Sequence, residues 1–255
     1  MDARDGVREH CARHEIENGA KMKIVILSGG PSGEHPISIK TGLAASAALE
    51  RLGFETISVR IEQNGRWILR DEKSLSPADG LAAVAKLGAH AAFIALHGPF
   101  GEDGVIQALL ETIGLGYQGS GVRASALAMN KSMTKTILSH AGLPVAPEVL
   151  VTKSASLETV AEMAVKRLSL PLFVKPAHLG SSVGAGKANS LDELSAAINV
   201  GLAVDDSVVV EPLLIGQELT CGVLMDEKTG KLRALPSILI EPVGHEFFDF
   251  ESKYT

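Results

Sequence analysis

Short apolar runs that stop at glycines alternate with segments of helical spacing over the first 120 residues. Lys23–Ser28 is a β-branched run that ends at Gly29 and Gly30, a pattern typical of a buried strand that enters a loop. Apolar residues then recur at helical spacing over Ser38–Leu52, and Gly53 stands where the end of a helix is expected. The same patterns predict, in chain order, strands at 55–61 and 91–96 and a helix at 105–113 that Asp103 caps and Gly114 ends. This alternation predicts a parallel sheet with helices on both faces.

The pattern changes beyond residue 120, where a proline-rich linker, Ala141–Pro147, separates two short helices from a second group of elements. The last stretch is rich in strands, and Asp226–Gly230 is predicted to form a hairpin turn within it. The predicted elements of this half are helices at 124–129, 132–140, 157–168 and 191–200, and strands at 148–152, 172–175, 207–211, 218–225, 232–239 and 247–250. A chain of 255 residues with this organisation is expected to form two domains.

Composition and charge exclude several classes of protein. Of the 255 residues, 45% are hydrophobic and 21% are charged, which excludes disorder as the main state. The net charge of −6 argues against nucleic acid as the main partner, although a nucleotide needs only a few local donors. No run approaches the ~20 apolar residues of a membrane helix, and the first 22 residues lack the apolar core of a signal peptide. The two cysteines, Cys11 and Cys221, are interpreted as incidental thiols in a reducing cytosol.

A loop of glycines and serines, Gly180–Gly184, follows the predicted strand that ends in Lys175. Glycines allow backbone N–H groups to approach an anion, and a nearby lysine supplies a charge for phosphate. Taken alone, such a loop is more often an ordinary turn between two strands. It is not a Walker A loop, because five residues separate Gly180 from Gly186 where that motif has four, and Lys187 is followed by alanine.

Two further polar groups follow predicted parallel strands, at the sheet edge where open α/β proteins bind ligands. His97 begins the run His97–Gly104, and Glu34 lies in the first glycine loop. Taken alone, His97 is more often a structural histidine with a satisfied hydrogen bond. Glu34 is equally well interpreted as a solvated loop acid or as an acid near a helix N-terminus. The spacing of these residues does not decide between the interpretations.

Six runs taken together resemble D-alanine:D-alanine ligase, an ATP-grasp enzyme, in the order of that family from Lys23 to the last residue. The runs are GGPSGEHPIS (Gly29–Ser38), HGPFGEDG (His97–Gly104), GSGVRASALAMNKSMTK (Gly119–Lys135), FVKPAHLGSSVG (Phe173–Gly184), VVVEPLLIGQELTCGVL (Val208–Leu224) and FFDFESKYT (Phe247–Thr255). Six ordered runs are far more specific than any one of them.

The resemblance implies an α/β fold in which a Rossmann-like, parallel-sheet domain precedes the first α+β lobe of the ATP grasp and the start of the second lobe. The expected boundaries are a disordered extension at 1–22, a substrate-binding domain at 23–122, the small ATP-grasp lobe at 123–212 and the beginning of the second lobe at 213–255.

The resemblance also implies a role for each matching residue. Glu34 is expected to hold the ammonium group of the first D-alanine, with His97 beside it, while Ser181 and Tyr254 hydrogen-bond to Glu34 as a mobile loop closes. Lys253 is expected to approach the γ-phosphate and the carboxylate of the second substrate. The catalytic set is therefore Glu34, Ser181, Lys253 and Tyr254, and the residues expected around ATP are Lys131, Lys175, Gly180, Ser181, Ser182, Val183, Gly184, Glu211, Pro212, Leu213, Leu214 and Glu218. Residues 211–214 of that set line the adenine and ribose pocket, with Glu218 on the ribose.

The implied activity is the ATP-dependent joining of two D-alanines through an acyl phosphate, which supplies peptidoglycan synthesis in the bacterial cytoplasm. The complete enzyme is expected to be a homodimer and to use Mg²⁺, or Mn²⁺ in its place. The small-molecule partners expected are D-alanine and ATP, and neither nucleic acid nor a membrane is expected as a partner.

The chain departs from the family pattern at two places. Asn130 stands where the family usually has an aspartate before the phosphate-binding lysine. The sequence stops at Thr255 within the omega loop, so the family's metal ligands and oxyanion donors have no counterpart in it, and no metal ligand is assigned. Three interpretations stay open: a ligase fragment that forms no dipeptide alone, a non-catalytic binding module, or a ligase that uses D-lactate or D-serine as its second substrate.

Overall fold

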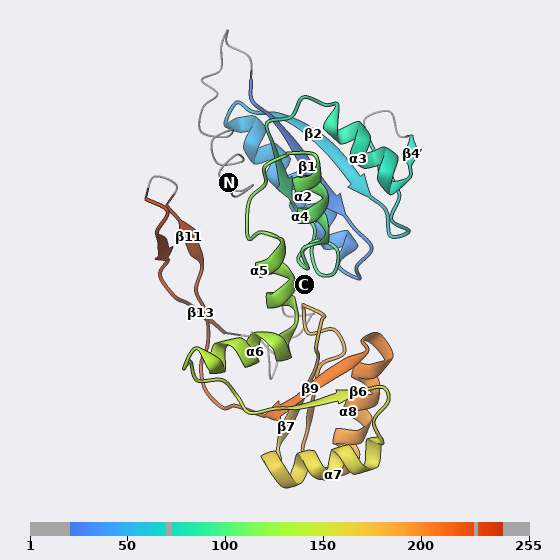
Figure 1. Cartoon of the computed structure of the whole chain (residues 1–255), viewed down its shortest axis with the longest axis vertical. Coiled ribbons are helices and arrows are strands. Elements are labelled where there is room, and N and C mark those ends of the chain that lie inside the picture. Colours follow the sequence, from blue (N-terminus) through green and yellow to red (C-terminus); the bar gives the residue numbers. More distant parts are fainter. Residues whose placement is uncertain (1–20, 70–72, 227–228, 242–255) are drawn as a thin grey trace. The chain divides into compact units, whose positions relative to one another are not determined.

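The computed structural model describes residues 21–69, 73–226 and 229–241 (Figure 1). The chain divides into two compact units, Met1–Ile137 and Leu138–Thr255. No helix among these described residues is long and apolar enough to cross a membrane.

The first unit is built on a five-stranded sheet with the order β4-β3-β2-β1-β5. Three strands are parallel, as predicted: β1 (Lys23–Gly29), β2 (Glu55–Ile61) and β5 (Ala91–Ile94). The sheet is nevertheless mixed, because β3 (Trp67–Ile68) and β4 (Ser74–Leu75) extend it in antiparallel register. These two strands have two residues each, too few for a period of two to be visible in the sequence.

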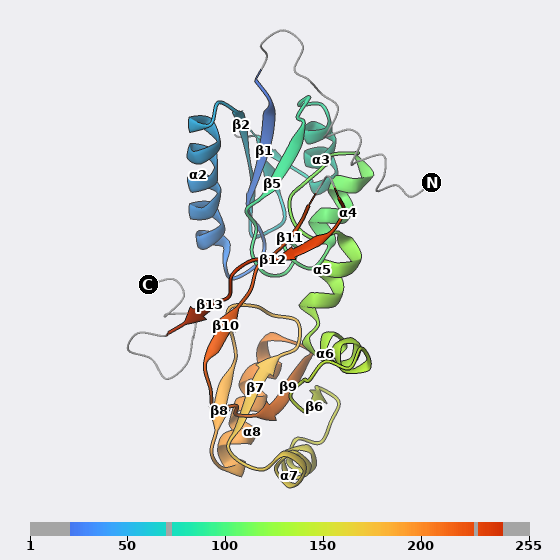
Figure 2. The same cartoon turned by 90° about the vertical axis from the view of Figure 1, so that its left-hand side faces the viewer.

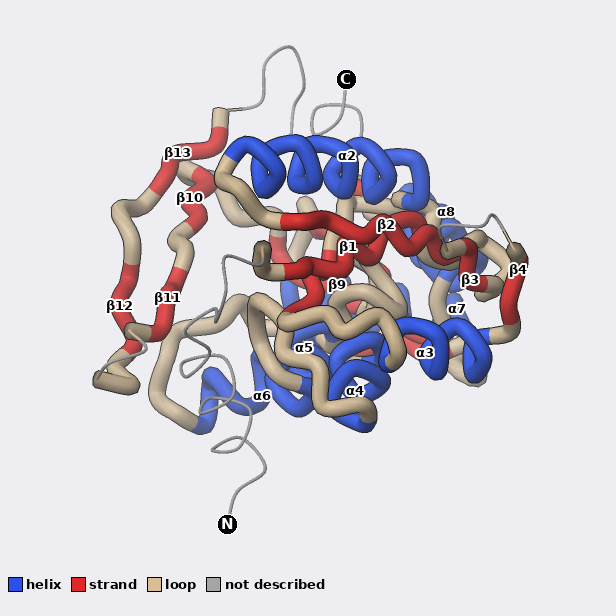
Figure 3. The backbone as a smooth tube through the Cα atoms, turned by 90° about the horizontal axis from the view of Figure 1, so that it is seen from above, coloured by secondary structure: helices blue, strands red, loops and turns tan. Residues whose placement is uncertain are grey.

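Helices cover both faces of this sheet, as the alternation predicted. Helix α2 (His35–Arg51) lies on one face, and α3 (Pro77–Ala85) and α4 (Val105–Thr112) lie on the other (Figures 2 and 3). Successive β1 residues serve the two faces in turn. Val25 and Leu27 belong to a core that includes residues of α3 and α4, whereas the core around Ile24 and Ile26 includes Leu49 of α2.

The helix boundaries of the first unit correct two expectations. Helix α2 begins at His35 instead of Ser38, because Pro36 suits the first turn of a helix. Asp103 does not occupy the N-cap of α4, which is Gly104 with φ of 94°. The Asp103 carboxylate instead accepts hydrogen bonds from the N–H groups of Phe100 and Val105 at 2.8 and 3.0 Å.

Helix α3 was not predicted, although its start carries a recognisable signal. The Ser76 hydroxyl accepts a hydrogen bond from the N–H of Asp79 at 3.2 Å, and Pro77 follows the cap. A serine N-cap with proline at the first helical position is a common start of a helix. Two further helices follow α4, namely α5 (Val122–Met129) and α6 (Lys131–His140).

The second unit contains a four-stranded antiparallel sheet with the order β6-β9-β7-β8. Its strands are β6 (Val149–Thr152), β7 (Leu172–Pro176), β8 (Gly186–Ala188) and β9 (Ser207–Pro212). Helices α7 (Leu157–Leu168) and α8 (Leu191–Val204) pack on one face through a shared core. Strand β8 was not predicted, and it makes the glycine loop the link between two antiparallel strands.

Two antiparallel pairs form the rest of the described chain. Strand β10 (Glu218–Thr220) pairs with β13 (Ile238–Ile240), and β11 (Val223–Met225) pairs with β12 (Leu232–Ala234). Each of the two long strands predicted here is therefore divided into two shorter strands. The first is interrupted at Gly222, and the second at Pro236, which has no N–H to donate to a β-ladder. The hairpin turn at Asp226–Gly230 is confirmed by the hydrogen bond from the Asp226 N–H to the Lys231 carbonyl at 2.9 Å. The strand predicted at 247–250 lies outside the described residues.

The contact between Trp67 and Gly80 generates a stability prediction. Trp67 is fully buried, and a Cβ on Gly80 of α3 would lie 2.6 Å from its Cβ and Cγ atoms. Gly80→Ala should therefore destabilise the first unit by about 1–3 kcal/mol through overpacking. Helix propensity alone would give the opposite sign, a gain of about 0.5–1 kcal/mol.

Urea unfolding followed by fluorescence measures this effect, because Trp67 is the one tryptophan of the chain. Gly33→Ala is the matched control, since a Cβ there meets nothing within 4 Å. A Gly80→Ala protein as stable as the wild type would show that α3 moves away from β3 without cost.

Candidate functional site

The carboxyl ends of β1 and β5 form one edge of the first unit, and Ser38 of α2 connects them. Its hydroxyl accepts a hydrogen bond from the Gly29 N–H at 2.8 Å and donates one to the Ala95 carbonyl at 2.8 Å. Ser38 is fully buried. Buried backbone groups need such partners, so this hydroxyl fixes the points at which the two loops leave the sheet.

Glu34 lies in the first of these loops, at the N-cap of α2, and is only 5% exposed. Its N–H donates to the Ser32 hydroxyl at 3.2 Å, and that hydroxyl donates to the His97 carbonyl at 2.7 Å. A Cβ on Gly98, whose φ is 68°, would lie 2.7 Å from Glu34 Oε2. The structure thus brings Glu34 and the His97 loop together, and the interpretation of Glu34 as a solvated acid is wrong.

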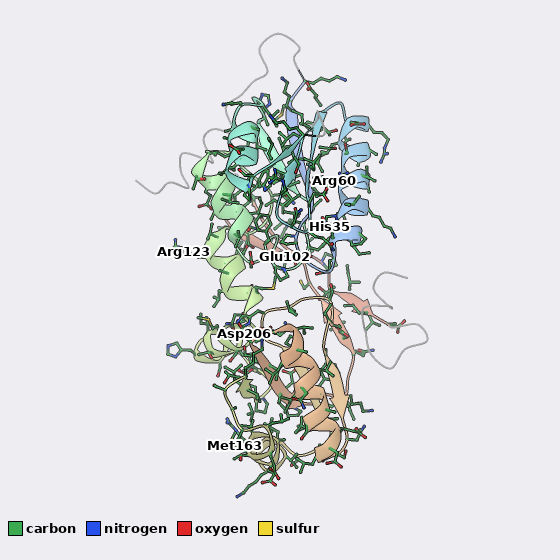
Figure 4. All side chains as sticks on the ribbon, turned by 90° about the vertical axis from the view of Figure 1, so that its right-hand side faces the viewer. His35, Arg60, Glu102, Arg123, Met163 and Asp206 are labelled. Carbon is green, nitrogen blue, oxygen red and sulfur yellow. The ribbon has the colours of Figure 1, made fainter. Side chains whose placement is uncertain are left out.

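The imidazole of His97 is oriented by the same helix. Its Nε2 lies 3.0 Å from the Thr41 hydroxyl, which donates its own proton to the Ile37 carbonyl at 3.1 Å. Because a hydroxyl has one proton, Thr41 accepts from His97 and Nε2 carries the hydrogen. The far side of the loop is held by Glu102, labelled in Figure 4, whose Oε2 accepts from the Gly98 N–H at 2.7 Å.

In the second unit, Lys175 of β7 and Glu211 of β9 form an ion pair on the sheet face opposite α7 and α8. The pairing register sets this arrangement, because residues of β7 such as Val174 point into the helix-covered core and Lys175 points the other way. The ammonium nitrogen also lies 5.3 Å from the centre of the Phe173 ring. Glu211 is buried whereas the Lys175 side chain remains 38% exposed, so the pair orients a cation that an anion can reach.

The loop Gly180–Gly184 connects β7 to β8 and holds several residues in left-handed backbone conformations. Ser181 and Ser182 have φ of 50° and 58°, which is uncommon for residues with a side chain. Gly184 has φ of 69°, and a Cβ there would lie 2.7 Å from Val204 Cγ2. A strand and not a helix follows this loop, which confirms that it is not a Walker A loop.

The other predicted residues lie at several places. Pro212 ends β9, Leu213 donates its N–H to the Pro171 carbonyl at 3.0 Å, Leu214 is 72% exposed and Glu218 begins β10. Lys131 begins α6 in the other unit. Lys253 and Tyr254 lie outside the described residues.

Sequence reasoning missed the residues that position the predicted ones. Ser32, Ser38 and Thr41 hold the Glu34 and His97 loops, and His178 and Asp205 hold the glycine loop. Ser32 could have been found from the sequence, because a serine hydroxyl in a turn often accepts a hydrogen bond from the backbone N–H two residues later. The partners of Ser38 and His178 are distant in sequence, so no local pattern marks those two residues.

Comparisons with known proteins agree with one another. The family profile described as D-ala D-ala ligase N-terminus matches residues 23–87, and the profile described as D-ala D-ala ligase C-terminus matches residues 137–255. The D-alanine–D-alanine ligase of Actinobacillus succinogenes is 41% identical over 234 residues, which are 92% of this chain and 69% of that protein. D-alanine–D-alanine ligase A of Bradyrhizobium diazoefficiens is 36% identical over 265 residues, which are 92% of this chain and 70% of that protein.

Solved structures give the same result. The D-alanine–D-alanine ligase of Coxiella burnetii superimposes with a TM-score of 0.74 at 30% identity, covering 86% of this chain and 71% of that one. The D-Ala:D-Ser ligase VanG of Enterococcus faecalis superimposes with a TM-score of 0.72 at 29% identity, covering 92% of this chain and 74% of that one.

The Ser38 bridge generates a prediction for this region. Ser38→Ala removes the partner of the Gly29 N–H and of the Ala95 carbonyl together, so the first unit should lose about 1–3 kcal/mol. Ser46→Ala, on the same helix, removes a hydroxyl whose partners Glu50 and Thr56 are accessible to water and should cost less than about 0.5 kcal/mol. Urea unfolding followed by Trp67 fluorescence compares the two, and equal losses would contradict the role given to Ser38.

Proposed function

This chain belongs to the D-alanine–D-alanine ligase family, and from that premise we propose that it serves the ATP-dependent joining of two D-alanines to D-alanyl-D-alanine for peptidoglycan synthesis. The observation that carries this proposal is the burial of Glu34 at the shared end of β1 and β5. A buried carboxylate favours a cationic ligand, and the ammonium group of an amino acid is one. Gly98 lets the His97 loop approach this carboxylate closely, since a Cβ at that position would lie 2.7 Å from Glu34 Oε2.

Most of the proposed nucleotide residues lie around the face of the second sheet opposite α7 and α8. Lys175 presents its ammonium group from a rigid strand and is held in place by Glu211. The loop Gly180–Gly184 begins four residues after the end of β7 and would cover the phosphates with backbone N–H groups and the hydroxyls of Ser181 and Ser182. The exposed Leu214 would meet the adenine, and Glu218 the ribose.

The reaction proceeds in two steps. A carboxylate oxygen of the first D-alanine attacks the γ-phosphorus of ATP, the bond to the bridging oxygen breaks and ADP leaves, which forms an acyl phosphate. The amine of the second D-alanine, after losing a proton, attacks the carbonyl carbon, and inorganic phosphate leaves. Such a reaction depends mainly on positioning and on the neutralisation of charge, which buried ion pairs and oriented backbone donors supply.

The second substrate is proposed to be D-alanine. The support for this choice is that the relatives with 36–41% identity are D-alanine–D-alanine ligases. The family also implies Mg²⁺, but within residues 21–69, 73–226 and 229–241 no three His, Cys, Asp or Glu side chains form a group that could hold a metal ion. We therefore assign no step to a metal bound by these residues.

A cytoplasmic location and a homodimer complete the proposal, and both come from the resemblance alone. The homodimer is proposed for the complete enzyme, so sedimentation velocity of that enzyme tests it, and a monomer at micromolar concentration would contradict it.

Glu34→Gln tests the D-alanine site. Loss of the carboxylate charge should weaken D-alanine binding about 10- to 100-fold and leave ATP binding within about twofold, because charge-assisted hydrogen bonds contribute about 1.5–3 kcal/mol. Equilibrium dialysis with labelled D-alanine measures the first quantity. Glu50→Gln, an exposed acid of the same helix, is the control and should change neither affinity. Equal D-alanine binding by the Glu34→Gln protein would remove Glu34 from the site.

Lys175→Ala tests the nucleotide site. We expect ATP affinity to fall about 10- to 100-fold, since the phosphates lose a charge-assisted contact. Lys166→Ala is the matched control, because Lys166 is an exposed lysine of α7, on the other side of the same sheet. Circular dichroism verifies that the Lys175→Ala protein is folded although its ion pair with Glu211 is lost. Equal losses of ATP affinity in the two variants would mean that net charge alone, and not a site at Lys175, attracts the nucleotide.

A further inference from the structure

Asp205 is a carboxylate in an unfavourable place. It is the C-cap of α8, at the end of the helix where the dipole is negative, and its side chain is only 6% exposed. Both features disfavour an ionised acid. An ionised acid at this position therefore needs strong hydrogen-bond donors, and those donors indicate the structural role of Asp205.

Two of the donors to Asp205 come from a single residue of the loop between β7 and β8. The N–H of His178 donates to Oδ2 at 2.7 Å, and its imidazole Nδ1 lies 2.9 Å from Oδ1. The N–H of Asp206 donates to Oδ1 at 2.7 Å. Burial raises the pKa of Asp205, but the hydrogen bonds from His178 outweigh it and hold that pKa below its usual value. The carboxylate is thus charged at neutral pH, and its attraction is lost only as the pH falls through the lowered pKa.

The same helix end also holds the other side of the loop. Gly184 is packed so closely that a Cβ would lie 2.7 Å from Val204 Cγ2 and 3.6 Å from the Cα of Gly201, both in the last turns of α8. Ser181 and Ser182, with their left-handed φ angles, lie between this contact and the His178–Asp205 pair. Left-handed conformations of residues with side chains persist only where the surroundings impose them. The two anchors supply that constraint.

We infer that the His178–Asp205 pair is a clamp that holds the stem of the Gly180–Gly184 loop against α8, and that both are positioning residues for the nucleotide. This inference rests on the proposed function, in which the loop covers the phosphates of ATP. A loop that is held at its stem before ATP arrives loses less conformational freedom on binding.

The charges adjacent to the clamp provide a matched control. Asp206, labelled in Figure 4, is the next residue after Asp205, and its side chain is 89% exposed. It pairs with Lys153 at 2.7 Å, not with the loop. Asp206→Asn therefore removes the same charge one position away while leaving the clamp intact.

Hydrogen exchange of the 179–184 amides in the full 255-residue chain tests the clamp without any ligand. We expect His178→Ala and Asp205→Asn to raise the exchange of these amides about tenfold, while amides of β7 and β9 exchange as in the wild type. His178→Asn should restore protection to within about twofold, because the Asn side-chain N–H can take the place of Nδ1–H. Asp206→Asn should leave the exchange unchanged.

Three results would overturn the clamp: unchanged exchange in His178→Ala, equal increases in Asp206→Asn, or no restoration by His178→Asn. The last comparison separates a specific hydrogen bond from a general loss of packing at position 178. His178 is an exposed residue, so its variants are expected to fold.

Repeating the exchange measurement over a range of ATP concentrations tests the link to the nucleotide. ATP should protect the loop amides in the wild type, and His178→Ala should need about tenfold more ATP for the same protection. Equal ATP requirements would overturn the positioning role even where the loop has loosened. A wild-type loop that ATP does not protect would contradict the proposed function of the loop, whereas the comparison without ATP would still decide whether the clamp exists.

Discussion

Burying a carboxylate costs free energy unless donors surround it, and this constraint connects the parts of the molecule that matter for function. Three buried acids are subject to this constraint. Glu34 is buried beside the Gly98 backbone, Glu211 is buried against Lys175, and Asp205 is buried against His178. Glu211 and Asp205 each bond to a residue distant in sequence, and Glu34 lies against the distant His97 loop.

The two units present their candidate residues on different kinds of sheet. In the first unit, parallel strands bring two loops to one edge, where a small substrate can lie among backbone groups and a buried acid. In the second unit, α7 and α8 cover one face of an antiparallel sheet, and Lys175 lies on the other face. A proposed amino-acid site and a proposed phosphate site therefore rest on different scaffolds. The two family profiles, which match residues 23–87 and 137–255, follow the same division.

Much of the fold was predictable because it depends on local patterns. Strand β2 and helix α7 have the predicted bounds, since their apolar spacing is regular over a full element. Strands β3, β4 and β8 were missed because two or three residues cannot display a period. The candidate residues Glu34 and His97 were named from motifs, but their proximity depends on Ser32 and Ser38, whose bonds to the β5 side span 65 and 57 residues. The clamp at His178 depends on a partner 27 residues away and has no local signal either.

The central claim is that D-alanine binds at the ends of β1 and β5, whereas ATP binds around Lys175 and the Gly180–Gly184 loop. Chemical-shift mapping of the backbone amides in the ¹⁵N-labelled protein tests this claim most directly, because each ligand shifts the amide signals of the residues around it. The account predicts that D-alanine shifts the amides of residues 29–34 and 97–104, and that ATP shifts those of 173–184 and 211–218. Shifts from both ligands in the same set of amides, or shifts from D-alanine that are reproduced equally by L-alanine, would contradict it.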